Sequence, residues 1–424
     1  MSNDSRTDDT ETRRSFLSRK TCAGIIGSIA LGGCLDRFPR GVDPVEDRSA
    51  ESRNSTDQPI GSHEPMGTED ATFERLDRWE ADGDTELTAD TENVFSGSQS
   101  ASVEGGSGVI RIEYPSLIDL SGYDISFAMD IERPDGTIVH LGLTDVDGNR
   151  TAYRSQFYQS SYPSGYLRYA PSVTSYEAEM SRIASIQLWI DADGEPPKYR
   201  VDDVRFEEKR FDRAKFVFTF DDVLRSQYET AYPIMSDYGF VGSLAVNTEL
   251  LGENDRLTLE ELAELDTEGW SIDNHTHSHV ELRGLPEKQQ RREIETPLDF
   301  LADHGFEAPN AFYYPHGNAD RTSLEIVAEH HDIAYNAFTH WSTGLSPTTP
   351  MARYWTNRML PRSAAPVERR IDLAIESKSV CTPYWHTIRD GGEIDPVEFE
   401  KICAYLEERS DRIDVVLPER IALD

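Results

Sequence analysis

The chain has 424 residues, and 78 Asp and Glu against 42 Lys and Arg give it a formal net charge of −36. This length is enough for two or three domains, and 37% hydrophobic residues exclude a chain that is disordered throughout. The acidic balance argues against nucleic acid or an anionic lipid surface as a partner, because like charges repel. Only seven of the 42 basic residues are lysines, and such an acidic, lysine-poor composition predicts a halophilic protein.

Residues 1–33 are predicted to be an export signal. Arg13 and Arg14 precede a short apolar run, which falls below the roughly 20 residues that span a bilayer, and Cys34 follows Leu31-Gly32-Gly33. This arrangement resembles a twin-arginine signal peptide that ends in a lipobox, which implies that Cys34 is lipidated after cleavage. We therefore expect the protein to be secreted, or held on the extracellular face of the membrane by that lipid alone.

Residues 34–69 are polar and lack apolar periodicity, which predicts an acidic, disordered linker. Residues 70–210 alternate apolar and polar side chains with a period of two, and Pro134-Asp135-Gly136 and Asp147-Gly148-Asn149 mark turns between the runs. No long helical pattern appears there, so we predict an antiparallel β-sandwich. The positions expected to face its core are Ile125, Phe127, Met129, Ile131, Val139, Leu141, Leu143, Ile186, Leu188 and Ile190.

The predicted last strand of this sandwich, Tyr199–Phe206, resembles the closing strand of jelly-roll carbohydrate-binding modules. Aromatic faces for sugar rings could come from a tyrosine-rich stretch, although ordinary edge-strand and loop aromatics explain it equally well. The tyrosines of this stretch are Tyr158, Tyr162, Tyr166 and Tyr169.

After residue 211, short apolar strands alternate with helices, which predicts a parallel sheet. The predicted strands are 215–220, 241–246, 270–273, 311–314, 333–338, 379–385 and one at 415; the predicted helices are 226–239, 258–269, 286–304, 321–331, 366–377 and 395–412. Thr258 and Glu261, three residues apart, resemble a capping box at the start of the second helix. This many units can close, so we predict a deformed (β/α) barrel over residues 211–424. Cys381 and Cys403 in this region could form a disulfide in an exported protein, or remain two buried thiols.

The distinctive polar groups lie where the predicted strands end. Asp221 and Asp222 follow the first strand, and two adjacent carboxylates repel unless a cation or a shared proton offsets the charge. His275, His277 and His279 follow the third strand, although the whole chain has only 11 histidines. Two imidazoles and a carboxylate suit zinc and similar metals and leave a position for water. The pattern therefore predicts a metal site.

Two further segments, Phe312–Gly317 and Pro383–His386, lie at the ends of the strands predicted over 311–314 and 379–385. Together and in this order, the four segments resemble the motifs of the NodB-homology polysaccharide deacetylases, and the resemblance covers about residues 213–417. The third segment departs from the family, which often has arginine at the position of Tyr313 and tyrosine at that of His316. The family's fourth motif is not clear in this chain.

The resemblance implies one divalent metal ion held by Asp222, His275 and His279. Zinc is the default ion, and cobalt, nickel or manganese would also suit these ligands. It further implies that Asp221 is the general base and that His386 protonates the leaving group. His277 has no role in the family.

The resemblance also assigns supporting roles. Arg358 would orient the base, and Trp341 would represent the tryptophan of the fourth motif. The residues expected to line the substrate groove, donate to the oxyanion or wall the acetyl pocket are Tyr314, Pro315, His316, Trp341 and Trp385. The implied function is metal-dependent removal of N- or O-linked acetyl groups, by an activated water, from a polysaccharide or cell-surface glycan. We expect a monomer.

Two alternatives stay open. One is another metal hydrolase, because Asp273-Asn274-His275-Thr276-His277 also looks like the opening of amidohydrolase-type barrels, and the same segment could begin a metallo-β-lactamase motif. In the former, a whole barrel of about 250 residues follows that motif, and too few residues remain here. Neither explains Asp221 and Asp222. The other alternative is a surface lipoprotein that binds glycans without catalysis through a degenerate barrel.

Overall fold

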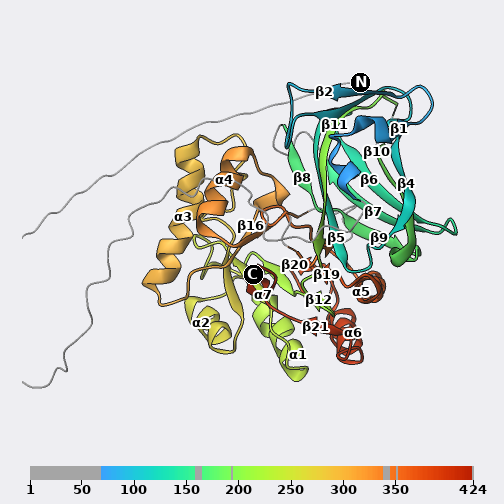
Figure 1. Ribbon diagram of the computed structural model, residues 1–424. Coiled ribbons are helices and arrows are strands. Elements are labelled where there is room, and N and C mark those ends of the chain that lie inside the picture. Colours follow the sequence, from blue (N-terminus) through green and yellow to red (C-terminus); the bar gives the residue numbers. More distant parts are fainter. Residues whose placement is uncertain (1–67, 158–164, 192–193, 338–343, 350–351, 423–424) are drawn as a thin grey trace, which may run out of the picture. The chain divides into compact units, whose positions relative to one another are not determined.

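The computed structural model describes residues 68–157, 165–191, 194–337, 344–349 and 352–422 (Figure 1). The predicted signal segment, Cys34, nearly all of the predicted linker, Tyr158, Tyr162 and Trp341 lie outside the described residues. Within the described part of the chain, every helix is too short or too polar to cross a membrane.

Residues 79–208 fold as two antiparallel sheets, as predicted. Their strands are β1 (Trp79–Ala81), β2 (Glu86–Asp90), β3 (Ser100–Glu104), β4 (Ile110–Ile118), β5 (Tyr123–Arg133), β6 (Thr137–Asp145), β7 (Arg150–Phe157), β8 (Leu167–Tyr169), β9 (Ser172–Tyr176), β10 (Ile183–Ile190) and β11 (Lys198–Glu208). One sheet has the order β1-β4-β10-β6-β7-β9 and the other the order β2-β3-β11-β5-β8. Short 3₁₀ turns cover Glu69–Thr72, Leu76–Arg78 and Met180–Arg182.

The apolar alternation of the sequence places one face of each sheet in the core of this sandwich. All ten predicted inward positions are buried, from Ile125 on β5 to Ile190 on β10. Burying one such side chain contributes about 1.5–3 kcal/mol. Both predicted turns join consecutive strands: residues 134–136 connect β5 of one sheet to β6 of the other, and residues 147–149 connect β6 to its neighbour β7. The carboxylate of Asp145 accepts the amide N–H groups of Asp147 and Asn149 in the second turn.

The predicted sugar-stacking role does not hold for Tyr169. This ring is 4% exposed and stacks on Phe127 inside the sandwich core, with 5.8 Å between the ring centroids. Tyr166 is half-buried and its hydroxyl donates to the carbonyl oxygen of Asn93. Tyr169 is therefore a core residue, because an inward position on β8 takes an aromatic side chain as readily as an aliphatic one.

The described residues of the C-terminal half form ten short strands in two sheets. They are β12 (Ala214–Phe216), β13 (Thr219–Asp221), β14 (Ser243–Val246), β15 (Ser271–Asn274), β16 (Ala311–Tyr313), β17 (Ile333–Tyr335), β18 (Leu345–Ser346), β19 (Val380–Cys381), β20 (Tyr384–Trp385) and β21 (Ile413–Val415). The order β17-β16-β15-β14-β13-β20 is parallel throughout, and the second sheet, β18-β19-β12-β21, is parallel except for β18. The predicted deformed (β/α) barrel is confirmed, as is the sandwich before it.

The sequence did not show that two predicted strands divide. The strand predicted over 215–220 becomes β12 and β13, and the strand predicted over 379–385 becomes β19 and β20. Each of these two segments therefore passes from one sheet into the other. Pro383 lies at the second break, where it has no N–H to continue a ladder. A continuous apolar run gives no sign of such a change of partner, because both halves are buried.

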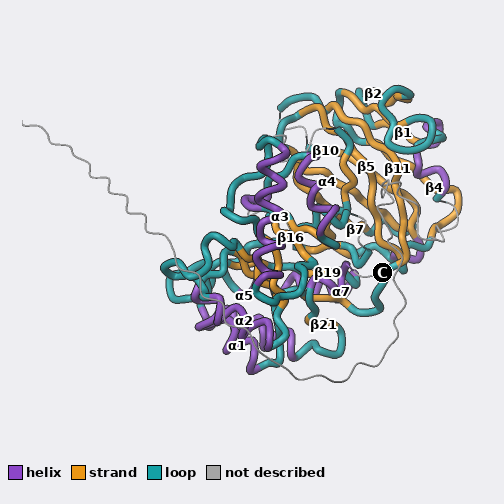
Figure 2. Tube along the Cα trace, turned by 90° about the vertical axis from the view of Figure 1, so that its left-hand side faces the viewer, coloured by secondary structure: helices purple, strands orange, loops and turns teal. Residues whose placement is uncertain are grey.

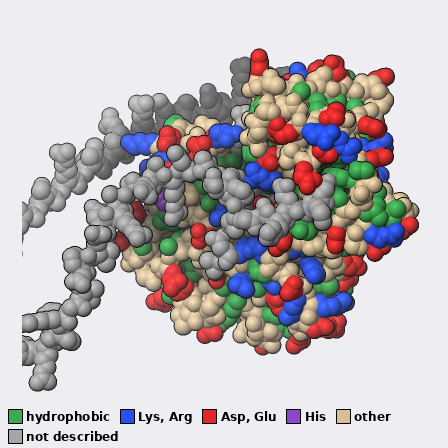
Figure 3. Space-filling model, in the orientation of Figure 1, with side chains coloured by type: hydrophobic (Ala, Val, Ile, Leu, Met, Phe, Trp, Pro, Cys, Tyr) green, Lys and Arg blue, Asp and Glu red, His purple; other side chains and the backbone are tan. Residues whose placement is uncertain are grey.

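Helices alternate with these strands as predicted (Figure 2). They are α1 (Tyr232–Asp237), α2 (Leu259–Thr267), α3 (Glu287–Asp303), α4 (Arg321–His330), α5 (Ala364–Ser377), α6 (Pro396–Glu407) and α7 (Pro418–Ala422), and a π-helical turn (Gln227–Ala231) precedes α1. The predicted capping box is present: the Thr258 hydroxyl accepts the N–H of Glu261, whose carboxylate accepts the N–H of Thr258. Cys381 and Cys403 are free, buried thiols. Asp and Glu side chains are scattered over the face drawn in Figure 3, interspersed with Arg and Lys.

Candidate metal centre and active site

The predicted functional residues meet at one edge of the six-stranded parallel sheet. Asp221 is the last residue of β13 and Asp222 follows it, residues 275–279 follow β15, residues 314–317 follow β16, and His386 follows β20. These strands are parallel and hydrogen-bonded in series through β14. Parallel strands end at the same edge, so the fold gathers side chains that the sequence separates by more than 160 residues.

Asp222, His275 and His279 form a cluster that could hold a metal ion. One ligand atom of each lies within 4.8 Å of the others. Oδ1 of Asp222 is 3.4 Å from Nε2 of His279 and 3.7 Å from Nε2 of His275. That oxygen is buried and has no hydrogen-bond partner among the described residues. A buried oxygen anion facing two imidazole nitrogens fits a cation, which would supply the missing partner.

The backbone around these ligands is strained. Asp222 has a φ of 74° and His279 a φ of 58°, both in the left-handed region that non-glycine residues rarely adopt. The carbonyl of Asp222 accepts a hydrogen bond from the guanidinium of Arg256, which helps to hold this conformation. Such strain persists where the surrounding structure enforces it, and it turns both side chains toward the cluster.

Both histidines are held in the neutral form that binds metals. Nδ1 of His275 lies 2.7 Å from the carbonyl oxygen of Tyr313, and since a carbonyl only accepts, Nδ1 carries the proton and Nε2 keeps its lone pair. Burial lowers the pKa of His275. Burial and the neighbouring His275 lower the pKa of His279 to about 4.

Arg358 holds Asp221 beside this cluster. The guanidinium makes two parallel hydrogen bonds, Nη1 to Oδ1 at 2.7 Å and Nη2 to Oδ2 at 2.8 Å, and both side chains are buried. The rings of Tyr313 and Tyr384 lie 4.6 and 4.4 Å from its central carbon. Burial alone would raise the pKa of Asp221, but the charge of Arg358 outweighs it, so the pKa lies well below its usual range. Asp221 is therefore an ionised carboxylate in a fixed orientation.

His386 is paired with a carboxylate that the sequence did not indicate. Its Nδ1 lies 2.9 Å from Oε1 of Glu393, and its backbone N–H donates to Oε2 at 2.7 Å. Burial would lower the pKa of His386, but the hydrogen bond to Glu393 and the charge of Asp221 raise it above its ordinary value. Glu393 belongs to a loop and matches no motif, and in a chain with 78 acidic residues nothing distinguished it.

Part of this edge of the sheet is similar to a known protein family. Residues 208–332 match the family model described as polysaccharide deacetylase. The C-terminal half of the chain contains a polysaccharide deacetylase domain. Members of this family are hydrolases that act on acetyl groups. The matched residues include Asp221, Asp222, His275 and His279, but the match ends before Arg358 and His386, whose places in the site rest on geometry.

Three similar proteins illustrate the extent of the likeness. The putative polysaccharide deacetylase YxkH of Bacillus subtilis (strain 168) is 29% identical over 111 residues, which cover 26% of this chain and 40% of YxkH. The Streptococcus pyogenes deacetylase PplD, solved in complex with acetate, is 25% identical over 36% of this chain and 66% of that chain, with a TM-score of 0.32. A family 4 acetyl xylan esterase from Clostridium thermocellum, solved in complex with a cobalt ion, is 15% identical. The likeness covers 49% of this chain and 89% of the esterase chain, with a TM-score of 0.36. The chain thus spans less than half the length of YxkH.

The third motif of the deacetylase domain contributes differently from what the sequence predicted. The side chains of Tyr314 and Pro315 are buried, so they do not line a groove. His316 is exposed, has a φ of 57°, and its ring packs edge-on against that of His279 with 4.8 Å between centroids. The N–H groups of Tyr314 and Gly317 donate to the carbonyl oxygens of Tyr335 and Tyr314. Of these residues, His316 is the one that faces the metal cluster.

The prediction for Trp385 was wrong. This side chain is fully buried, its Nε1 donates to the carbonyl oxygen of Pro361 at 2.9 Å, and its ring packs on Phe218, Phe220 and Phe399. Successive side chains of a strand point to opposite faces, so on β20 the neighbours of Trp385 reach the site while Trp385 enters the core. Trp341 lies outside the described residues. His277 contacts Thr248 through Nδ1 at 2.9 Å and is not part of the metal cluster.

Proposed function

We propose that the chain removes N- or O-linked acetyl groups from a polysaccharide by metal-dependent hydrolysis. One observation carries this proposal: the unpaired Oδ1 of Asp222 faces Nε2 of His275 and His279, directly beside the carboxylate that Arg358 holds. The two residues between which a substrate would react are Asp221, which ends β13, and His386, which follows the neighbouring strand β20. The fit of the donor set to a divalent ion supports a hydrolase of the deacetylase family over a binding protein.

Asp222, His275 and His279 would hold the ion, which when bound would activate water and polarise the acetyl carbonyl. Asp221 accepts the proton of the attacking water. Its two hydrogen bonds to Arg358 fix the carboxylate in place, so Asp221 is already oriented before the reaction begins. Zinc is the ion that we propose first, and cobalt, nickel or manganese would suit the same ligands.

His386 completes the reaction as the general acid. Glu393 keeps Nδ1 protonated and raises the pKa of the ring, so the imidazolium can give a proton from Nε2 to the departing amine or hydroxyl. The backbone N–H of His316 is the donor that we assign to the developing oxyanion. Proton acceptor and proton donor thus come from two neighbouring strands, β13 and β20.

We extend the proposal to the setting of this activity. The substrate would be an acetylated polysaccharide or the cell's own surface glycan, and the sandwich over residues 70–210 would be an accessory domain to the deacetylase domain over 211–424. A twin-arginine signal over residues 1–33, lipidation at Cys34 and a linker to residue 69 would place a monomer outside the cell. The acidic surface predicts unfolding on dialysis into low salt, followed by circular dichroism; full stability and activity there would contradict a halophilic origin.

The first experiment combines elemental analysis with an acetate-release assay. We expect one divalent ion per chain and acetate release from acetylated chito-oligomers or acetylated xylan, both lost on chelation and restored by added Zn²⁺ or Co²⁺. Bound metal without acetate release across a broad panel of acetylated glycans would overturn the proposal in favour of a glycan-binding lipoprotein. Activity that survives complete removal of metal would overturn the metal-dependent mechanism.

A further inference from the structure

Arg358 lies in a stretch with little regular structure. Between β18 and α5, the described residues form isolated bridges, Thr356 with Tyr335 and Met359 with Pro383, and no helix. We call the described residues 344–349 and 352–360 the arginine segment. A catalytic group must be held within about 0.5 Å of its productive position, so the contacts that hold this segment bear on the reaction.

The first anchor of the arginine segment is Asp124, at the start of β5 in the sandwich. Its Oδ2 accepts four hydrogen bonds, from the N–H and hydroxyl of Thr348 at 2.7 Å each and from the N–H and hydroxyl of Thr349 at 3.0 and 3.2 Å. The ammonium of Lys209 pairs with Oδ1. Asp124 is 4% exposed, and a buried carboxylate needs its partners, so it fixes residues 348 and 349 against the sandwich.

The second anchor is Ser172 on β9, the edge strand of the other sheet. Its hydroxyl donates to the carbonyl oxygen of Leu345 and accepts from Nδ2 of Asn357 at 3.4 Å. Oδ1 of Asn357 accepts from Nδ2 of Asn336 at 3.1 Å, and the carbonyl oxygen of Asn336 accepts from Nε of Arg358 at 3.1 Å. All these groups are buried. A continuous series of hydrogen bonds therefore runs from β9 to the guanidinium that holds Asp221.

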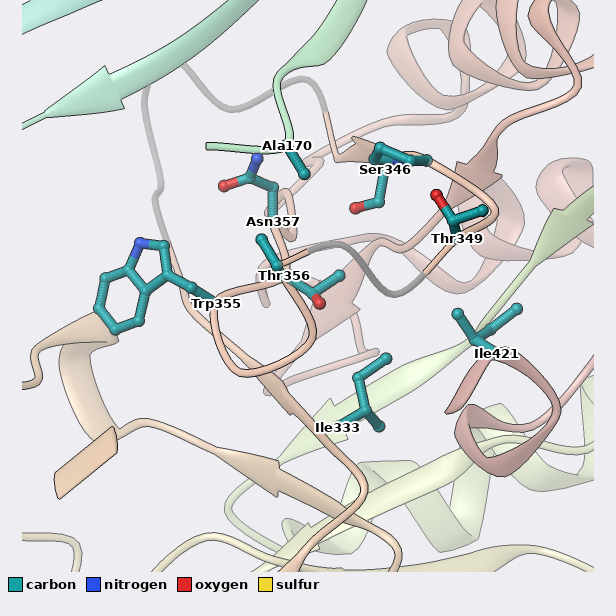
Figure 4. A pocket seen from close by; sticks show the side chains of 10 residues that line it. Ala170, Ile333, Ser346, Thr349, Trp355, Thr356, Asn357 and Ile421 are labelled. Carbon is teal, nitrogen blue, oxygen red and sulfur yellow. The ribbon is translucent and has the colours of Figure 1, made fainter. Parts of the chain in front are cut away.

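Apolar packing also joins the two parts: Val173 of β9 lies in one buried cluster with Leu345 and Met359 of the arginine segment, and Trp355 packs against the sandwich core. A cavity of about 20 Å³ lies among Ala170 of the sandwich and Ser346, Thr349 and Asn357 of the arginine segment (Figure 4). Where side chains do not fill the space between two elements, the hydrogen bonds across it fix their relative position. The links from Asp124 and Ser172 are thus the main polar restraints that the sandwich places on the arginine segment.

We propose that Asp124 and Ser172 of the β-sandwich are positioning residues for the deacetylation reaction. Acting through the arginine segment, they hold Arg358 and through it the base Asp221, so the sandwich is part of the catalytic unit. The inference rests on the proposed function.

The test uses the full chain loaded with metal and compares Asp124→Asn and Ser172→Ala with wild type. We expect kcat to fall by about 10- to 100-fold for Asp124→Asn, and by less for Ser172→Ala, because a displaced catalytic group slows the chemical step. KM and metal content should not change. Ser172→Thr keeps the hydroxyl and should restore kcat. If Asp124→Asn does not fold, Ser172→Ala and Ser172→Thr still decide the matter.

Asp145→Asn is the matched control. Asp145 is also a buried sandwich carboxylate with four donors, but all four come from the sandwich itself: the N–H groups of Asp147, Asn149 and Glu179 and the side-chain amide of Asn149. Its replacement should lower stability and leave kcat at the wild-type value. Equal losses of kcat in Asp145→Asn and Asp124→Asn would overturn the proposal, because they would show a general effect of a weakened sandwich.

A double-mutant cycle separates positioning from stability. In the Arg358→Lys background the two-pronged hold on Asp221 is absent, so Ser172→Ala should cause no further loss of kcat. Additive losses would overturn the proposal. If wild type itself released no acetate, the proposed function would fail, and hydrogen exchange would then test the inference alone. Faster exchange of the amides of residues 352–360 in Asp124→Asn than in Asp145→Asn supports it, and equal exchange overturns it.

Discussion

Two carboxylates, one in each half of the molecule, have opposite surroundings. Asp145 in the sandwich ends β6 just before a turn, and its oxygens accept four hydrogen bonds. Asp222 in the deacetylase domain has a left-handed backbone, and its buried Oδ1 has no partner among the described residues. The sandwich uses its polar groups to close turns, whereas the barrel leaves a polar group unpaired for a ligand. A buried polar atom without a partner, on a residue with a strained backbone, therefore indicates a functional site more clearly than the residue type does.

The largest expected effect is that of Asp222→Asn. The amide keeps the shape and tolerates a positive φ, but it is a poor metal ligand, so metal content and acetate release should both fall to background. The metal-free variant should be at least as stable as metal-free wild type, because Oδ1 gives up no hydrogen bond. Elemental analysis and thermal unfolding in chelator measure the two effects. A variant with full metal content and activity would remove Asp222 from the site.

Asp221→Asn should keep the metal and lose the reaction. We expect kcat to fall by roughly 10²–10⁴-fold, since the residue no longer accepts a proton. Unlike Asp222→Asn, it should also destabilise the protein, by about 3–5 kcal/mol, because Arg358 is left as a buried charge without its partner. Steady-state kinetics and urea unfolding test both parts. A fully active variant would refute the assignment of the base.

Glu393→Gln should shift the pH dependence of the reaction. His386 must carry a proton to act as an acid, so activity is lost as pH rises through its pKa. The charged groups that raise this pKa are Glu393, Asp221 and Asp222, and removal of the first lowers it. The basic limb of the kcat/KM profile should therefore move to lower pH. His386→Ala is the control, since it should abolish that limb, and an unmoved limb in Glu393→Gln would show that Glu393 does not tune the acid.

Asp145→Asn should have the smallest effect on activity and a clear one on stability. Hydrogen bonds from the N–H of Glu179 and the side chain of Asn149 lower the pKa of Asp145 to about 2. The unfolded value is about 3.9, so its contribution to stability is present at neutral pH and lost as pH falls from about 4 toward 2. The variant should melt earlier at pH 7 but show a weaker loss of stability below pH 4. Thermal unfolding of wild type and variant at pH 7 and below pH 4 tests this. Equal melting temperatures of the two proteins at both pH values would show that Asp145 does not contribute to stability.

Local signals in the sequence predicted much of this molecule. The capping box of Thr258 and Glu261 depends on residues three apart, and the strands could be recognised from short apolar runs. The metal cluster was predictable because its ligands have distinctive chemistry and follow strands that run in parallel. What the sequence could not show depends on contacts across the fold. The partner of His386 is an ordinary glutamate of a loop, and the burial of Trp385 depends on which face of a two-residue strand meets the core.

The place of Arg358 has a consequence for recognising enzymes of this kind. Its guanidinium rests on the ring of Tyr313, at the position where the third motif of such deacetylases often has arginine. A search by motif would look for the positive charge at residue 313 and find a phenol. A search by atomic positions would find the guanidinium of Arg358 against the carboxylate of Asp221. A search by motif alone therefore misses a charge that comes from a different part of the sequence.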